Sequence, residues 1–184
     1  EYRSSMELTL FTHTAMNSTY GESFIVYNPD FQTLKIHSSY TRQKDGTIVK
    51  TPDNAFVEVL PRFAADAPAY NQLKEMVVVH TGLELGATIY LDYSIITKPG
   101  YYPALDINER LQETSPVKEC KVSISVPEGT PLACGLYGSP VKAVEESHDG
   151  IKEVHWTLRN IPASSREAFQ PKNREASPHL VAST

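Results

Sequence analysis

The sequence predicts an all-β protein, an antiparallel β-sandwich of about ten strands with two long irregular connections. Segments that alternate apolar and polar residues recur about every ten residues, with turn-forming residues between them. Ten tyrosines, thirteen prolines and repeated Val, Ile and Thr favour strands and turns over helices. Asp-Gly pairs at residues 45–46 and 149–150 separate such segments, as in β-hairpins.

The first predicted strands precede residue 51 and cover 6–14, 23–28, 33–43 and 47–50. The first and third alternate with a period of two, which is typical of strands that bury one face. In the third, this alternation places Tyr40 on the same face as Leu34 and Ile36. It places Thr41 on the opposite face, with Lys35 and His37.

Two segments without a sustained period, residues 51–72 and 98–116, are the predicted irregular connections. Further strands are expected at 73–81, 87–97, 117–127, 132–138, 140–147 and 151–160. The segments 117–126 and 132–138 are expected to pair as a hairpin. Residues 1–160 therefore form one expected sandwich domain. Residues 161–184, which are rich in Pro, Ser and Ala, form an expected C-terminal extension or linker.

The glycines at Gly82 and Gly86 raise the question of a phosphate-binding loop. Such a loop runs from a strand into a helix, whose N-terminal amides hold the phosphate. Here a strand pattern follows at 87–97, and the Gly-Lys-Ser/Thr sequence is absent. The segment 81–86 is therefore predicted to be a hairpin connection, with glycines that supply backbone angles other residues resist.

Charge and hydropathy exclude two classes of partner. The formal net charge is −5, and no run of lysines or arginines stands out. Binding to nucleic acid depends on clustered positive charge, so we expect no nucleic-acid partner. No apolar stretch approaches the roughly 18 residues of a membrane-spanning helix, so we expect no membrane insertion.

Residue types with catalytic or metal-binding chemistry occur without the spacing that such sites need. The six histidines show no HxH, HxxxH or HExxH pattern: His13, His37, His80, His148, His155 and His179. Ser139 follows a glycine but lacks the Gly-x-Ser-x-Gly frame of a hydrolase nucleophile. The carboxylates of Glu145 and Glu146 point to opposite faces of a strand. We therefore expect no catalytic residue, no metal site and no cofactor.

The two cysteines, Cys120 and Cys134, are too few for a disulfide framework. In the expected hairpin they lie several residues apart along the ladder, which favours two small packed thiols over a bond. The segment Pro-Gly-Tyr-Tyr-Pro is a different case, because it places Tyr101 and Tyr102 in a proline-rich loop. Their rings are candidates for contact with a glycan or a peptide, or they cap the core beneath the loop.

The order of several short motifs resembles the family called domain of unknown function 3857. These are Thr41, Asp45, Gly46 and Pro52, then GLELGATIYLDYSI, then Pro116 and Pro127, and finally Trp156, Asn160, Pro162, Ala163, Glu167 and Pro171. The resemblance runs from about residue 20 to the C-terminus and leaves the first residues unmatched. It implies a β-rich module that usually precedes a transglutaminase-like, papain-related cysteine peptidase domain in exported bacterial proteins.

The function expected from this resemblance is that of a non-catalytic accessory module. Such a module positions or supports a following transglutaminase-like domain and lies outside the cytoplasm, in the periplasm or at the cell surface. The family has no agreed catalytic residues, so none is carried over, and the chain itself is not expected to be an enzyme. The alternatives are a carbohydrate- or peptide-binding module that uses Tyr101 and Tyr102, and an independent hydrolase with a dispersed site.

Overall fold

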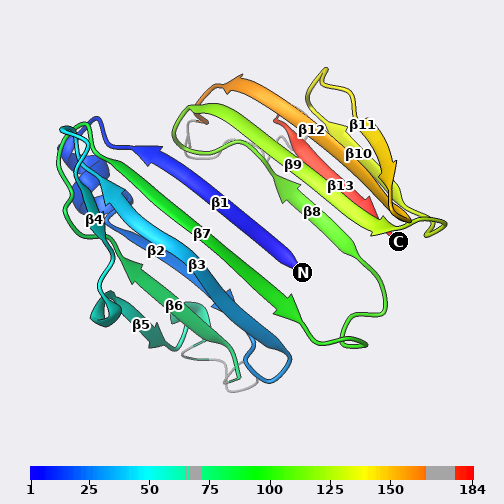
Figure 1. Cartoon of the computed structure of the whole chain (residues 1–184), viewed down its shortest axis with the longest axis horizontal. Coiled ribbons are helices and arrows are strands. Elements are labelled where there is room, and N and C mark those ends of the chain that lie inside the picture. The colour runs from blue at the N-terminus through cyan, green and yellow to red at the C-terminus, as the bar shows by residue number, and fades with distance from the viewer. Residues whose placement is uncertain (65, 67–71, 165–176) are drawn as a thin grey trace. The chain divides into compact units, whose positions relative to one another are not determined.

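The computed structural model describes residues 1–64, 66, 72–164 and 177–184, and the chain divides into two compact units (Figure 1). Unit 1 comprises Glu1–Tyr101 and unit 2 comprises Tyr102–Thr184. All strand pairs of the described residues are antiparallel, which confirms the all-β prediction. The division falls inside the predicted connection 98–116 and not at residue 160.

Unit 1 contains two sheets. One has the order β1-β7-β3-β4, and we name it the β7 sheet. The other has the order β2-β6-β5, and we name it the β6 sheet. The strands of the two sheets are β1 (Tyr2–Thr9), β7 (Thr88–Thr97), β3 (Gln32–Arg42) and β4 (Ile48–Lys50), and β2 (Glu22–Tyr27), β6 (Lys74–Val79) and β5 (Phe56–Val59). Three short helical turns complete the unit: η1 (Ala15–Thr19), η2 (Asp53–Ala55) and η3 (Arg62–Ala64).

The core of unit 1 lies between these two sheets. Ile25 and Val78 of the β6 sheet pack with Leu91 of the β7 sheet. Leu34 and Ile36 are among the half-buried side chains that surround them. Burial of this apolar area supplies about 25 cal/mol for each Å² removed from water.

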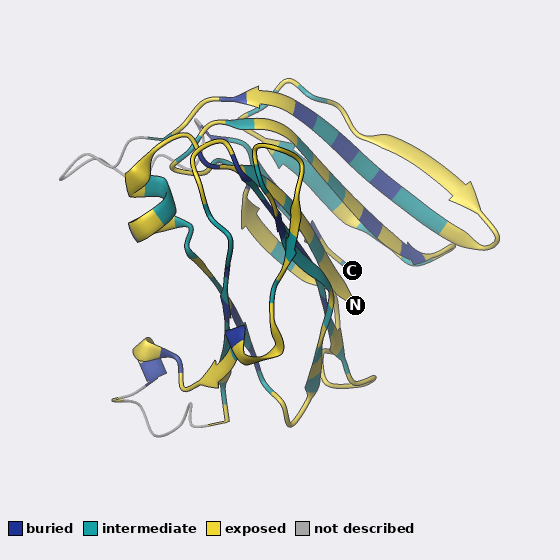
Figure 2. Cartoon of the chain, turned by 60° about the vertical axis from the view of Figure 1, so that its left-hand side comes forward, coloured by how far each residue is buried: buried dark blue, intermediate teal, exposed yellow. Residues whose placement is uncertain are grey.

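Unit 2 also contains two sheets, with the orders β11-β12-β9 and β10-β13-β8. Their strands are β8 (Asp106–Arg110), β9 (Val117–Pro127), β10 (Ala133–Tyr137), β11 (Val144–His148), β12 (Ile151–Ile161) and β13 (His179–Ser183). The alternation along β12 buries Val154, Trp156 and Leu158, and Figure 2 shows this periodic burial. These side chains pack with Leu180 of β13 in one core.

The C-terminal segment differs from the predicted extension. Residues 179–183 form β13, the middle strand of its sheet, and Leu180 and Ala182 are buried there. The stretch is only five residues long and follows a proline-rich segment, so its period did not stand out. The expected pairing of 117–126 with 132–138 is also wrong, because β9 pairs with β12 and β10 pairs with β13. Residues 165–176 of the expected extension lie outside the described part of the chain.

A bulge in β3 corrects the predicted faces of this strand. The register with β7 shifts between Ile36 and Ser38, so one extra residue separates the two halves. Thr41 lies opposite Ile89 and is buried, whereas Tyr40 lies opposite Tyr90 on the other face. Alternation counted without the bulge therefore gave the wrong side for both Tyr40 and Thr41.

The turns follow the glycine pattern of the sequence, with one difference. Gly46 and Gly150 have positive φ angles of 91° and 76°, and each lies in the hairpin that the Asp-Gly pair predicted. Gly82 and Gly86 also have positive φ, but β6 and β7 belong to different sheets. The segment between them thus crosses from one sheet to the other and is not a hairpin. It enters a strand, as expected, and not a helix.

Both predicted irregular connections contain a strand, β5 in the first and β8 in the second. Thirteen strands are therefore found in the described residues, where the periodicity predicted about ten. Among these residues, no helix has the length and apolar character needed to span a membrane.

Candidate functional site

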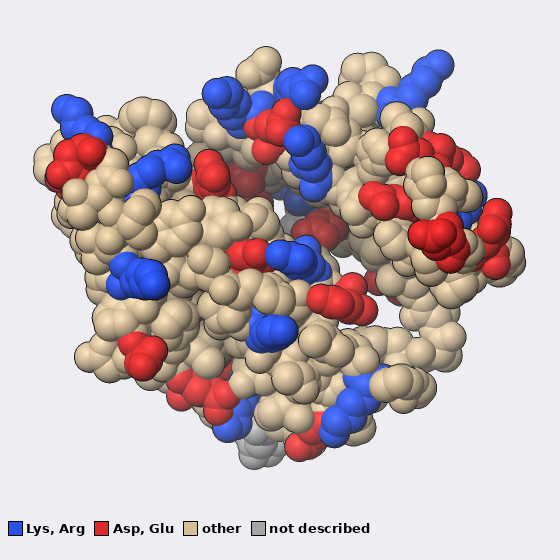
Figure 3. All heavy atoms as spheres, viewed as in Figure 1, with Lys and Arg blue, Asp and Glu red and all other residues tan. Residues whose placement is uncertain are grey.

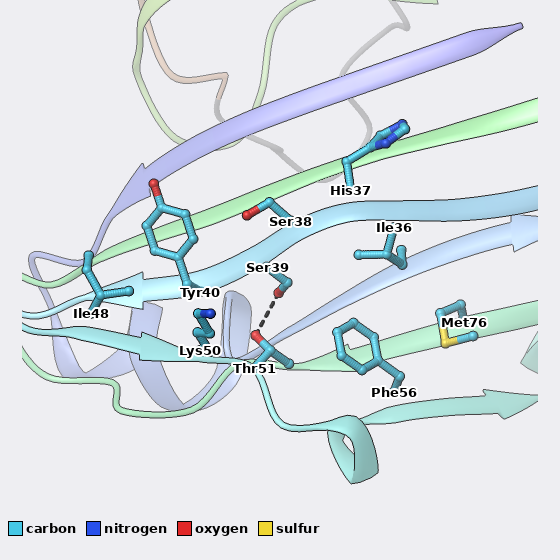
Figure 4. A pocket seen from close by; sticks show the side chains of 10 residues that line it. All are labelled: Ile36, His37, Ser38, Ser39, Tyr40, Ile48, Lys50, Thr51, Phe56 and Met76. Atoms are coloured by element: carbon cyan, nitrogen blue, oxygen red, sulfur yellow. Dashed lines mark hydrogen bonds between the residues drawn. The ribbon is translucent and has the colours of Figure 1, made fainter.

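A groove of about 700 Å³ runs along the edge of β3 in unit 1 (Figure 4). Five consecutive residues of β3, from Ile36 to Tyr40, form one wall. The other lining side chains come from β4, from the segment that follows it and from the β6 sheet: Ile48, Lys50, Thr51, Phe56 and Met76. This volume lies within the range of about 300 to 1,000 Å³ that is usual for ligand pockets.

The groove exists because β4 is much shorter than the strand beside it. β3 has eleven residues and β4 has three, so β4 pairs only with residues 40–42. Thr51 adds one more hydrogen bond, from its N–H to the carbonyl of Ser39 (3.1 Å). Pro52 follows, which has no N–H to continue a ladder, and the chain then leaves for η2 and the β6 sheet.

The chemistry of the groove is mainly apolar on the core side. Ile36, Phe56 and Met76 are half-buried and pack around the core of unit 1. The hydroxyls of Ser39 and Thr51 hydrogen-bond to each other (2.7 Å), as the dashed line in Figure 4 shows. Each hydroxyl therefore already has a hydrogen-bond partner. Among the described residues that line the groove, Lys50 is the only one with a formal positive charge, and none carries a carboxylate.

The face of the β6 sheet that points away from the core is also apolar. Phe24, Val77 and Val57 lie directly opposite one another across three strands. Val26 and Val59 flank Glu75 in the next row, and Val79 pairs with Glu22. We name these six apolar residues the β6 apolar face: Phe24, Val26, Val57, Val59, Val77 and Val79. Phe24 is 58% exposed and Val57 is 43% exposed.

The corresponding face of the β7 sheet is polar. Both carboxylate oxygens of Asp92 accept hydrogen bonds from Arg3, at 3.0 and 2.8 Å. The hydrogen bonds and charge of Arg3 hold the pKa of Asp92 below its usual value, although burial opposes this. Ser94 is fully buried and donates to the carboxylate of Glu1 (2.7 Å), and His37 Nε2 lies 2.8 Å from the same hydroxyl.

These side chains resemble a serine–histidine–carboxylate set only in composition. In the catalytic arrangement the carboxylate orients the histidine, and the histidine activates an accessible serine. Here Asp92 is occupied by Arg3, and the Ser94 hydroxyl is enclosed. The cluster therefore acts as a hydrogen-bonded surface that satisfies its own polar groups.

A second histidine–serine pair lies on the core side of unit 1. His80 is buried, and its Nε2 lies 2.8 Å from the hydroxyl of Ser23. Burial lowers the pKa of His80, because a charged imidazolium is poorly solvated there. Three buried polar atoms of this region have no hydrogen-bond partner among the described residues: His80 Nδ1, Thr41 Oγ1 and Thr81 Oγ1.

The candidate residues of the sequence analysis do not form one site in the described structure. Tyr101 is the last residue of unit 1, where its ring stacks on Phe31 with centroids 4.1 Å apart. Tyr102 begins unit 2 and is 60% exposed. Cys120 and Cys134 are free thiols, and burial raises the pKa of both. Ser139 accepts a hydrogen bond from the N–H of Val141 (3.3 Å).

No metal-binding group was expected from the sequence. In the part of the chain that the structure describes, no cluster of three or more His, Cys, Asp or Glu side chains is placed to hold an ion. Acidic and basic side chains are interspersed over the face shown in Figure 3, and acidic ones gather near the β11–β12 hairpin. There Glu146 lies directly opposite Glu153.

Comparison with protein families decides the membership of the chain. Residues 1–165 match the model of the family described as "Domain of Unknown Function with solved-structure structure (DUF3857)". The chain belongs to the DUF3857 family. The match begins at residue 1, so the first twenty residues, which the motif comparison did not include, are part of it. A search of curated proteins found no match.

Sequence reasoning missed both surfaces of this DUF3857 chain. The groove had a usable signal, because Pro52 closely follows the turn at Asp45-Gly46 and leaves room for only a short strand beside a long one. The β6 apolar face had a weaker signal. The segments 23–28 and 74–79 each hold four consecutive apolar residues, and this pattern does not tell whether the second face is covered by the same chain.

Proposed function

We propose that this DUF3857 chain is a non-catalytic interaction module that packs against a neighbouring protein domain and positions it. The partner is a following transglutaminase-like, papain-related domain, as the family resemblance implies, in a bacterial protein exported from the cytoplasm. The observation that carries this proposal is the β6 apolar face. A solvated sheet face normally carries polar side chains at its outward positions, whereas six of the eight outward positions here hold one phenylalanine and five valines, and the other two hold Glu22 and Glu75.

The physical argument concerns the cost of leaving this face in water. Phe24, Val57 and Val59 lie in adjacent rows of one sheet, and each is more than one-third exposed. Contiguous exposed apolar patches on soluble proteins mark interaction sites. Removing such side chains from water contributes about 25 cal/mol for each Å² of apolar area, from which the entropic cost of association is subtracted. Glu22 and Glu75 are the charged residues of the same face: Glu22 lies on the outer strand β2, whereas Glu75 lies on the central strand between Val26 and Val59.

The experiment uses the transglutaminase-like domain that, under this proposal, follows the chain in its parent protein. It is expressed separately, and its binding to the full chain described here is measured by isothermal titration calorimetry. Phe24→Glu should weaken binding by at least about tenfold, because a charge would enter an apolar contact. Phe11→Glu is the matched control, since Phe11 is 80% exposed and lies outside the β6 sheet. No binding, or equal loss with both variants, would contradict the proposal.

A second candidate is the binding of a glycan or peptide through Tyr101 and Tyr102. The stacked pair of Phe31 and Tyr101 favours it, because two parallel rings extend one aromatic surface. Binding to a glycan array that disappears in Tyr101→Ala and in Tyr102→Ala would support this function. Binding that survives both changes would exclude these tyrosines as the site.

A further inference from the structure

The edge of β3 that faces away from β7 has no strand partner over most of its length among the described residues. In an antiparallel sheet, alternate residues point their N–H and C=O groups toward each neighbour, so a strand without one leaves such groups available. Here the ladder with β4 covers residues 40–42, and the N–H of Thr51 reaches the carbonyl of Ser39. From residue 38 to residue 33, no other strand of the described residues pairs with this edge, and at its end the N–H of Gln32 donates to the carbonyl of Asn28 (2.7 Å).

The groove follows this edge, as its lining shows. Ile36 and Ser39 point toward Phe56 and Met76 on the core side of β3 (Figure 4). Ser38 and Tyr40 project from the opposite face of the same strand (Figure 4). A pocket on one face of a sheet would be lined by one of these sets. Because both contribute, the recess wraps the strand edge and exposes its backbone to an occupant.

The charges indicate which occupant fits. Lys50 lines the groove, Lys35 precedes the lining residues on β3, and Arg42 ends the strand. None of the described residues that line the groove is acidic. Asp92, which lies opposite Ser38 on β7, is already paired with Arg3. Two copies of this chain joined along the edge would bring like charges together, and the bulge at His37 would interrupt their ladder.

We propose that this groove binds an extended acidic peptide segment, which adds as a strand along the free edge of β3 beyond the end of β4. The peptide backbone would hydrogen-bond to β3, as in other cases of strand addition. Its alternate side chains would be apolar and would enter the recess between Ile36, Phe56 and Met76. A carboxylate of the peptide would meet Lys50. This site is separate from the β6 apolar face and does not depend on the proposed function.

The test is a selection of random linear peptides, displayed on phage, against the full chain. Enriched peptides should be acidic and should place apolar residues at alternate positions. In fluorescence-anisotropy titrations, Lys50→Glu should lower the affinity for the enriched peptides by roughly three- to tenfold, because one exposed ion pair is replaced by a repulsion. Lys118→Glu is the matched control, because Lys118 is an exposed strand lysine of unit 2. It should leave the affinity unchanged.

Two further measurements separate strand addition from other modes of binding. Methylating alternate amide nitrogens of an enriched peptide should abolish binding while its side chains stay the same, because the backbone hydrogen bonds are lost. Hydrogen exchange of the amides in residues 32–39 should slow when the peptide binds. Failure to enrich any peptide, enrichment of basic ones, or binding that is insensitive to both Lys50→Glu and amide methylation would overturn the proposal. A dimer of the chain that protects the same edge would also overturn it.

Discussion

The two sheets of unit 1 share one core, but the faces they turn away from that core differ in chemistry. On the β7 sheet, Arg3, Asp92 and Ser94 form hydrogen bonds that satisfy the polar groups of the face. On the β6 sheet, the same positions of the pleat carry Phe24, Val77 and Val57. In both sheets, alternate residues along a strand point to opposite faces. The β7 sheet has one apolar face, toward the core, whereas the β6 sheet is mainly apolar on both faces.

Because of this difference, we expect the two faces of the β6 sheet to serve different purposes, one for folding and one for binding. A polar outer face is complete in water, whereas an apolar outer face leaves area that a partner can cover. Substitutions on the core side should therefore lower the free energy of unfolding. Substitutions on the β6 apolar face should change binding and leave folding nearly intact.

The largest expected effect comes from placing one carboxylate on either side of the β6 sheet. Val78 is fully buried, so Val78→Asp should lower the free energy of unfolding of unit 1 by about 3 kcal/mol or more. Val57 is exposed on the opposite face, so Val57→Asp should cost less than about 1 kcal/mol. Urea denaturation of the full chain measures both values. Similar losses for the two variants would contradict the assignment of the faces.

A smaller effect concerns His80, on the core side beyond β6. Its pKa is lowered by burial, so the unfolded chain binds a proton more readily than the folded chain. Stability should therefore fall as the pH drops below the ordinary pKa of about 6.5 and through the lowered value, at up to roughly 1.4 kcal/mol per pH unit. His80→Gln should reduce this slope in urea titrations at several pH values. The wild-type chain, measured at the same pH values, is the reference for this slope.

A substitution on the polar face of the β7 sheet should also lower the free energy of unfolding, by a smaller amount. Asp92→Asn removes the ion pair with Arg3 and should cost about 1 kcal/mol near neutral pH, because Arg3 is largely exposed. The pKa of Asp92 is lowered in the folded chain, so its contribution is complete above the ordinary value near 3.8. It is lost as the pH falls through the lowered value. The difference between Asp92→Asn and wild type should thus shrink on acidification, and a constant difference would show that the charge is not its source.

The smallest expected effect on stability belongs to Phe24. Phe24→Ser should change the free energy of unfolding by no more than about 0.5 kcal/mol, since the side chain is mostly in water. The same variant should bind less of an environment-sensitive dye such as ANS than wild type does. A large loss of stability would show that the ring is already covered within the chain.

The sequence predicted much of the fold for identifiable reasons. Long alternating segments and Asp-Gly turns located β3, β7, β9 and β12 and the hairpins at Gly46 and Gly150. The bulge near His37 was not predictable, because one added residue leaves no distinct composition while it reverses the faces of Tyr40 and Thr41. The strand at 179–183 was missed because its pairing with β8 and β10 is entirely non-local.

The candidate site was less predictable than the fold. The groove and the β6 apolar face both depend on how strands and sheets are arranged in space, which the sequence pattern does not specify. Tyr101 and Tyr102 attracted attention through local composition, and the structure places them in different units. The groove depends on the difference in length between β3 and β4. The β6 apolar face depends on which side of β6 meets the β7 sheet, which alternation alone does not specify.

The central claim is that the β6 apolar face is covered in the parent protein. Hydroxyl-radical footprinting measures this directly, because it reports the solvent exposure of individual side chains in the isolated chain and in the intact parent. Phe24 should be oxidised readily in the isolated chain and protected in the parent, while Phe11 is oxidised equally in both. Equal oxidation of Phe24 in the two samples would contradict the claim.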